Sequence, residues 1–278
     1  GEATLNITNG GEAIFTNGPY LAAGVGTTGT ITISGSGSKL TAAGLVTIGD
    51  LGAGVLTISD GGTASVRSMS VGTFDKTAQG TVTVSGAGSA LTVFGATSKL
   101  DVGSTGIGTL SISEGGNVAV AASTFVGRNP SGSGTVTIAG NGSKLTTGED
   151  INVGHFGAGT LTITGGGEAA SGQNVVLGNF SGSSGTATIS ESGSKLTSVN
   201  DIVVGERGSG TLTVTGGGEA AASIDVVIGD EASGSGTVTV SGSGSKLTAG
   251  ENITVGNQGA ATLTVSDGGA VDSGTNVI

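Results

Sequence analysis

The chain has 278 residues, of which 59 are glycine, 2 are proline and none is cysteine, and its formal net charge is −11. The lack of cysteine excludes disulfides and thiolate metal sites. The acidic charge argues against nucleic acids and anionic membranes as main partners, because both are bound through basic surfaces. The glycines do not follow the Gly-X-Y triplet of collagen, and the regular alternation of Val, Ile and Leu favours an ordered core over disorder.

A short motif of the form Thr-apolar-Thr-apolar recurs from one end of the chain to the other. Successive copies lie 25 to 28 residues apart. With small variations, the motif begins at Thr4, Thr30, Val55, Thr81, Thr109, Thr135, Thr160, Thr186, Thr211, Thr237 and Thr262. A fixed period of this size indicates a solenoid, in which each repeat packs only on its neighbours.

The coil that begins at Thr135 shows the expected elements in chain order. Its first four residues alternate polar and apolar, which is typical of a half-buried strand. The expected elements are a strand at 135–138, a glycine-rich turn at 139–143, a strand at 144–146, a turn at 147–150, a strand at 151–154 and a closing turn at 155–159. Three short strands and three turns predict a triangular coil, and glycine supplies the positive φ that tight turns need.

The third strand of each coil contributes one aliphatic residue that is followed directly by glycine. These residues are Ile48, Val71, Val102, Val126, Val153, Leu177, Val204, Ile228 and Val255. We expect them to stack inward with parallel pairing between coils, about 4.8 Å apart. The predicted fold is therefore all-β: one parallel β-helix (β-solenoid) domain over 1–278, with about 11 triangular coils of about 25 residues. Right-handed winding is the default for parallel crossovers.

Charged residues mark the start of the second strand in five successive coils. They alternate in sign: Lys144, Glu168, Lys195, Glu219 and Lys246. Glu12 and Lys39 occupy the same position nearer the start, and Thr63, Ala90 and Asn117 fill it in between. Alternation removes the repulsion that stacked like charges would suffer, so we interpret these residues as a structural charge ladder that fixes the register of the coils. Catalytic or cation-binding carboxylates are the alternative, which the adjacent lysines disfavour.

A second polar ladder precedes the third strand. Its members are Asp150, Asn174, Asp201, Asp225, Asn252 and Asn276. Asn and Asp suit turns because their side chains bond local backbone groups, and this is the role expected of them. Calcium binding is the alternative, but the aspartate-bearing nonapeptide of calcium β-rolls does not recur in the chain.

The paired threonines of the first strand are expected to face outward in two ranks. Six successive coils carry them: Thr135/Thr137, Thr160/Thr162, Thr186/Thr188, Thr211/Thr213, Thr237/Thr239 and Thr262/Thr264. A flat Thr-x-Thr grid resembles the ice-contacting face of β-solenoid antifreeze proteins. The simpler explanation is that threonine is a good exposed strand residue.

Three phenylalanines, Phe74, Phe156 and Phe180, each lie two residues beyond the glycine that ends a third strand. Phe156 and Phe180 fall in adjacent coils and are expected to stack. The three form a candidate partner surface, or they fasten a glycine-rich turn. His155 is the only histidine, so neither a metal site nor a nucleophile–base pair can be assembled around it.

We therefore expect no catalytic, cofactor-binding or metal-binding residues, and no enzyme. Enzymes built on β-helices usually interrupt the repeat to form a cleft of carboxylates and basic residues. The largest irregularity in this chain is the 28-residue step from Thr81 to Thr109, and we expect no such cleft there.

The repeat, Gly-x-Gly-Thr-Leu/Val-Thr-Val/Ile-Ser, then Gly-x-Gly-Ser-Lys-Leu, then apolar-x-Val-Gly, resembles the passenger repeats of Gram-negative bacterial autotransporters over essentially the whole chain. Those exported surface proteins have β-helical passengers that act as adhesins, self-association rods, stalks or enzyme carriers. The resemblance implies an extracellular structural or adhesive rod at the bacterial cell surface. The alternatives are a flat Thr-array binder of ice or glycan surfaces and a polysaccharide-active β-helix enzyme.

The expected partners follow from the same resemblance and from the charge. They are the chain itself, end to end or laterally, or a host or surface ligand, possibly a glycan; nucleic acid is not among them. No stretch is long and apolar enough for direct membrane insertion, and none has the pattern of a signal peptide, so export signals are expected to lie outside this segment. Because the chain opens in mid-repeat and stops within a third strand, we expect it to be a segment of a longer array.

Overall fold

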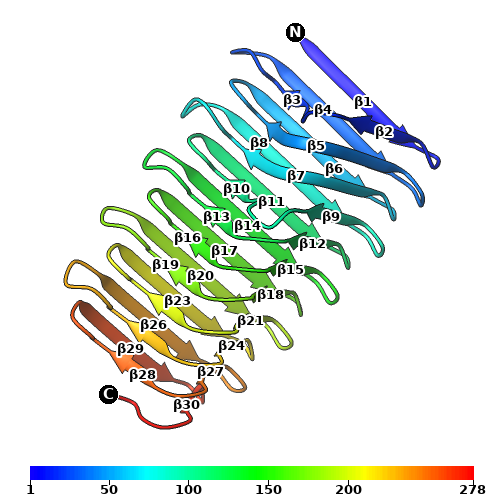
Figure 1. Cartoon of the computed structure of the whole chain (residues 1–278). Helices are drawn as coiled ribbons and strands as arrows, with labels where there is room; N and C mark the ends of the chain where they lie inside the picture. The colour runs from blue at the N-terminus through cyan, green and yellow to red at the C-terminus, as the bar shows by residue number, and fades with distance from the viewer.

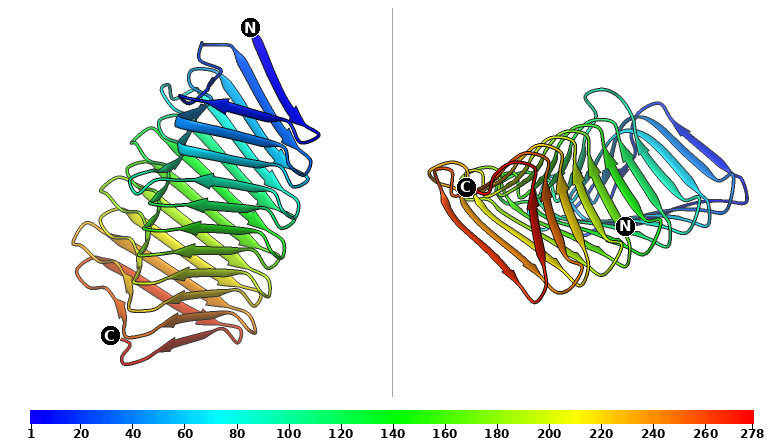
Figure 2. Two further views of the ribbon diagram at one scale, coloured as in Figure 1. Left: turned by 45° about the vertical axis from the view of Figure 1, so that its right-hand side comes forward. Right: turned by 90° about the horizontal axis from the view of Figure 1, so that it is seen from below.

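The computed structural model describes all residues 1–278 and consists of 30 strands joined by turns. The strands wind into coils stacked along one axis, with the two termini at opposite ends of the stack (Figure 1). Each strand pairs in parallel with the equivalent strand of the next coil, as β14 does with β17 and β16 with β19. Figure 2 shows the same stack from two further sides. The predicted all-β parallel solenoid is confirmed.

The first strands of the coils form one 11-stranded sheet. They are β1 (Glu2–Thr8), β4 (Thr28–Ser34), β6 (Ala53–Ser59), β8 (Gln79–Ser85), β11 (Ile107–Ser113), β14 (Ser133–Ala139), β17 (Ala158–Thr164), β20 (Ser184–Ser190), β23 (Ser209–Thr215), β26 (Ser235–Ser241) and β29 (Ala260–Ser266). Within β14, Val136 and Ile138 are buried while Thr135 and Thr137 face outward. The alternation of outward polar and inward apolar residues that the sequence predicts is therefore the alternation that the strand shows.

The second and third strands form the other faces of the coil. Second strands are β2 (Glu12–Phe15), β9 (Ala90–Val93), β12 (Asn117–Val120), β15 (Lys144–Thr147), β18 (Glu168–Ser171), β21 (Lys195–Ser198), β24 (Glu219–Ala222), β27 (Lys246–Ala249) and β30 (Ala270–Ser273). Third strands are β3 (Tyr20–Leu21), β10 (Leu100–Val102), β13 (Thr124–Val126), β16 (Ile151–Val153), β19 (Val175–Leu177), β22 (Ile202–Val204), β25 (Val226–Ile228) and β28 (Ile253–Val255).

Two coils near the N-terminus depart from the three-strand pattern. In β5 (Lys39–Ile48) and β7 (Thr63–Val71) the second and third strands are one continuous strand, which joins both faces into a single 19-stranded assembly. A register shift between Ala42 and Leu45 marks the place where the other coils make a full turn. The last coil has no third strand, only an isolated bridge from Val277 to Ile253, so about ten turns are complete rather than 11.

The core is a continuous stack of aliphatic side chains. Val153 pairs with Leu177, and Leu177 pairs with Val204, and all three are fully buried. They belong to one cluster of 51 buried residues that runs from Ile7 to Ile253. Burying a Val or Leu side chain contributes about 1.5–3 kcal/mol, while the parallel ladders satisfy the backbone polar groups. The predicted third-strand ladder is confirmed.

The corner between the third strand and the next first strand requires glycine for two reasons. Gly154 has a φ of 71°, in the left-handed region, and a Cβ there would overlap the carbonyl oxygen of Ser184 in the next coil. A Cβ on Gly185 would likewise overlap the carbonyl oxygen of Val153. Because the backbones of adjacent coils touch at this corner, any side chain would push the coils apart.

We predict that Gly154→Ala lowers the free energy of unfolding by about 2–4 kcal/mol, because it combines a disfavoured φ with overpacking. The matched control is Gly182→Ala, since Gly182 has a φ of 82° but open space around its Cα. The control should lose only the stability that alanine costs at a positive φ. Urea unfolding followed by circular dichroism measures both, and equal losses would show that the backbone approach at Gly154 is not limiting.

Candidate functional site

The structural charge ladder is in the predicted register. Lys144, Glu168, Lys195, Glu219 and Lys246 pair one above another along the second strands. Ion pairs join Lys144 to Glu168 at 3.3 Å and Lys195 to Glu219 at 3.6 Å, whereas Lys246 pairs with Asp272 at 3.4 Å. Each of these side chains is at least 39% exposed, so a pair contributes about 0–1 kcal/mol. The ladder is thus a series of separate surface pairs.

The Asp/Asn ladder bonds the next coil and not its own turn, which corrects the expectation of local bonding. The Oδ1 of Asp150 accepts the backbone N–H of Asn174 at 3.0 Å, and the Oδ1 of Asp201 accepts that of Asp225 at 3.0 Å. The Oδ1 of Asp225 accepts both the backbone N–H and the Nδ2 of Asn252, at 2.8 and 3.1 Å. These oxygens satisfy backbone groups that the turn leaves without a ladder partner. No group of three or more His, Asp or Glu side chains is arranged to hold a metal ion.

The outward face of the 11-stranded sheet is nearly free of charge. Its threonines stack in the predicted ranks, as Thr160 with Thr186 and Thr162 with Thr188. Among all the outward positions of its strands the one charged residue is Glu2, and the rest are mostly Thr and Ser. On a chain with a net charge of −11, this face is a distinct surface of small hydroxyl side chains.

The structure brings two of the three candidate phenylalanines together. The rings of Phe156 and Phe180 stack with centroids 4.1 Å apart and planes 12° from parallel, which confirms the expected stacking. His155 packs edge-on against both rings and against Phe125. Burial lowers the pKa of His155, and the charges of Arg128 and Lys99 lower it further, so the imidazole is neutral at neutral pH. The three rings of His155, Phe156 and Phe180 therefore pack together at a glycine-rich corner.

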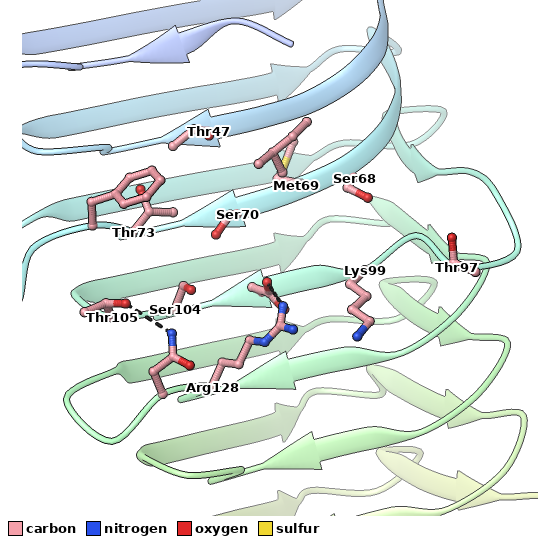
Figure 3. Close-up of a pocket in the computed structure, with 14 residues that line it drawn as sticks. Thr47, Ser68, Met69, Ser70, Thr73, Thr97, Lys99, Ser104, Thr105 and Arg128 are labelled. Atoms are coloured by element: carbon pink, nitrogen blue, oxygen red, sulfur yellow. Dashed lines mark hydrogen bonds and ion pairs between the residues drawn. The ribbon is translucent and has the colours of Figure 1, made fainter. Parts of the chain in front are cut away.

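Phe74 lies apart from that cluster, at the mouth of a cavity on the third face, and is 69% exposed. The cavity has a volume of about 420 Å³ and is lined by 14 residues, of which 3 are hydrophobic. Its floor is the outward column of the third strands, where Thr47, Ser70 and Asp101 pair in register. Figure 3 shows Thr47 and Ser70 on successive strands, with Lys99 just before β10 and Arg128 just after β13 in the coils beyond.

A partly buried ion pair closes one side of this cavity. The guanidinium of Arg128 bonds the carboxylate of Asp101, a residue that is only 7% exposed. Burial raises the pKa of Asp101 above its ordinary value, although the charges of Arg128 and Lys99 act in the opposite direction. Arg128 also lies over the ring of Phe125, 5.1 Å from its centroid, and the Lys99 Nζ lies 5.3 Å from the same point.

Two oxygens in this cavity are buried without a hydrogen-bond partner, the Oγ1 of Thr47 and the Oδ1 of Asp101. Neither residue was singled out from the sequence, and neither were Lys99 and Arg128. The feature of the sequence that could have pointed to this region is the 28-residue step from Thr81 to Thr109. Six residues, 94–99, separate β9 from β10, where three, 148–150, separate β15 from β16. The longer corner carries Thr97 and Lys99 into the cavity wall.

Comparison with known proteins adds little to this description. No family model and no curated protein matches the chain. Among solved structures, the chain is similar to that titled "Crystal structure of TibC-catalyzed hyper-glycosylated TibA55-350 fragment", at 19% sequence identity over 99% of this chain and 100% of that chain, with a TM-score of 0.28. A TM-score this low carries no information about function. No helix in the chain is long and apolar enough to cross a membrane.

We predict that Asp225→Ala lowers the free energy of unfolding by about 1–3 kcal/mol, because it leaves the backbone N–H of Asn252 without an acceptor. Asp225→Asn is the control, since its amide oxygen replaces the carboxylate oxygen, and it should retain the stability of the unsubstituted chain. Both are compared by urea unfolding. An Asn variant as unstable as the Ala variant would mean that the charge of Asp225, and not its hydrogen bond, matters.

We predict that Arg128→Ala destabilises the chain by about 2–3 kcal/mol at neutral pH, because Asp101 loses its partner. This is near the lower limit for a broken buried pair, since 32% of the Arg128 side chain is exposed. The pKa of Asp101 would rise further, so the native state would bind a proton more tightly than the unfolded state. Stability should therefore recover as the pH falls through that raised pKa.

Urea unfolding near neutral pH and at about pH 4 checks this dependence. The double variant Arg128→Ala/Asp101→Asn removes the unpaired charge and should be more stable than Arg128→Ala alone at neutral pH. A pH-independent loss in Arg128→Ala would show that packing of the arginine on Phe125, and not its charge, is what the chain loses.

Proposed function

We propose that the chain is an extracellular structural and adhesive rod, exposed on a bacterial surface or secreted. The observation that supports this best is the unbroken register of the first strands along the solenoid. Strands β1 to β29 pair in order through 11 first strands, which gives a rod of about 50 Å at about 4.8 Å per strand. Since every coil is hydrogen-bonded and packed to its neighbours, the rod is stiff and can hold its faces at a distance from an anchor.

The faces differ in chemistry, and that supports a role in contact with other surfaces. The 11-stranded sheet presents nearly charge-free rows of Thr and Ser, and the third face presents the cavity and the Phe156–Phe180 stack. The proposed partners are a second copy of the chain or a surface ligand such as a glycan. Phe74, Phe156 and Phe180 remain the candidate aromatic contacts, although only two of them lie together.

The proposed role is binding and not catalysis. In the cavity the one carboxylate, Asp101, is paired with Arg128, whereas the hydrolysis of glycosidic bonds typically uses two carboxylates across the scissile bond. A second candidate function is a flat-array binder of ice. The observation that favours it is the charge-free threonine face, with Thr211 stacked on Thr237 and Thr213 on Thr239.

We predict that beads coated with the folded chain cluster with one another or attach to glycan-bearing cells several-fold more than albumin-coated beads. If the threonine face makes the contact, Thr211→Lys/Thr213→Lys should reduce clustering, because two charges interrupt a flat uncharged surface. The matched control, Ser192→Lys/Ser243→Lys, adds the same charge at exposed turn positions and should leave clustering unchanged. Bead clustering is counted by microscopy or flow cytometry.

The same proteins decide between the two candidates. Beads that neither cluster nor attach would contradict the adhesive role. Slowed ice recrystallisation that the Thr211→Lys/Thr213→Lys variant loses and the Ser192→Lys/Ser243→Lys variant keeps would favour the ice-binding candidate in its place.

A further inference from the structure

We propose that the cavity on the third face is a saccharide-binding site, which accepts one sugar unit between Phe74 and Arg128. The proposal rests on the adhesive role above and names the ligand class of one of its surfaces. It depends on three properties of the cavity: buried oxygens without partners, a mostly polar lining of suitable size, and an exposed aromatic ring at the mouth.

The unpartnered oxygens point to a ligand that donates hydrogen bonds. The Oγ1 of Thr47 and the Oδ1 of Asp101 are buried in the cavity wall without a partner. Thr47 is fully buried and Asp101 is 7% exposed, so a ligand hydroxyl reaches these oxygens only after a small shift of the side chains that cover them. A buried polar atom left unsatisfied costs about 1–3 kcal/mol, so that contact is favourable once it forms. Water is the competing occupant, and a ring that carries several hydroxyls can replace more than one ordered water.

The size and lining of the cavity fit a sugar better than an apolar ligand. A volume of about 420 Å³ lies in the ~300–1,000 Å³ range of small-molecule sites. The lining is mainly hydroxyl, amide and charged side chains, with only Leu45, Met69 and Phe74 hydrophobic. Asp101 accepts hydrogen bonds, the Arg128 guanidinium donates them, and Asn129 does both, which matches hydroxyls that act in both directions.

Phe74 supplies the apolar contact that such a ligand needs. Its ring is 69% exposed at the mouth of the cavity. A sugar ring carries its hydroxyls at the rim and C–H groups on its faces, so one face packs on an aromatic ring while the rim reaches polar partners. Lys99, for which no carboxylate lies within ion-pairing distance, stands beside the ion pair and can meet the carboxylate of an acidic sugar. Neutral and acidic sugars share the ring chemistry on which the proposal rests.

The site occurs once because the outward column of the third strands changes along the rod. Thr47, Ser70 and Asp101 make it polar at the cavity. Farther along, the column continues with Phe125 and the buried Asn152. It is then apolar in three successive coils, with Val176, Val203 and Val227 in register, and ends at Thr254. The saccharide is therefore expected to bind at one defined height and not in every coil.

The test is an array of neutral and uronate-containing oligosaccharides, followed by calorimetry on the best-bound oligosaccharide. Thr47→Val removes the buried hydroxyl with little change in shape, and Phe74→Ala removes an exposed ring. Neither should unfold the chain. Each should weaken binding by about five- to tenfold or more. Phe94→Ala is the matched control, because it removes an aromatic ring that is 39% exposed and does not line the cavity, and it should bind like the unsubstituted chain.

The outcomes separate the site from the adhesive role. Binding that falls in Thr47→Val and Phe74→Ala but not in Phe94→Ala supports the proposal, whether the sugar is neutral or acidic. The proposal is overturned if no oligosaccharide binds, or if the three variants bind equally. Should beads still cluster or attach while no oligosaccharide binds, the adhesive role would stand and this assignment of the cavity would fail.

Discussion

The parallel hydrogen-bonded register between coils is the constraint on which the rest of the structure depends. Val126, Val153 and Leu177 occupy the same position in three successive coils and are paired directly. Once coils stack in register about 4.8 Å apart, every residue faces a copy of its own position above and below. A residue at a given position must therefore stack favourably on the equivalent residues of the two neighbouring coils. An unfavourable contact would recur in every coil that carries the same residue.

Each kind of column solves this problem differently. Aliphatic columns make the core. Columns of Thr and Ser run along the outward face of the 11-stranded sheet, because uncharged hydroxyl side chains stack without repulsion. A column of lysines would repel itself, so Lys144 is followed by Glu168 and Lys195 by Glu219. In the Asp/Asn column, Asp201 and Asp225 are adjacent, and one oxygen of each carboxylate, Oδ1, accepts a backbone N–H of the next coil.

The columns could be predicted from the period of the repeat, because the period alone determines which residues of successive coils stack on one another. Val153 and Lys144 were placed correctly for this reason. The Asp/Asn bonds were misassigned because rules for turns consider only neighbours in sequence, whereas the nearest free N–H belonged to the next coil. The Asp101–Arg128 pair was missed for a related reason: the two residues are one coil apart, and no local motif links them.

The position of the cavity shows how a solenoid can gain a site without losing its core. The longer corner at 94–99 leads directly into Leu100 and Val102, which keep their register with Met69 and Val71 in the coil before. All four side chains are fully buried, so the extra residues are accommodated outside the core and the stack continues unchanged. Because corners contribute little to the core, they are free to vary, and the strands between them present the variation at a fixed height on a stiff support. The irregular step in an otherwise regular repeat is thus the place where a specific function can develop.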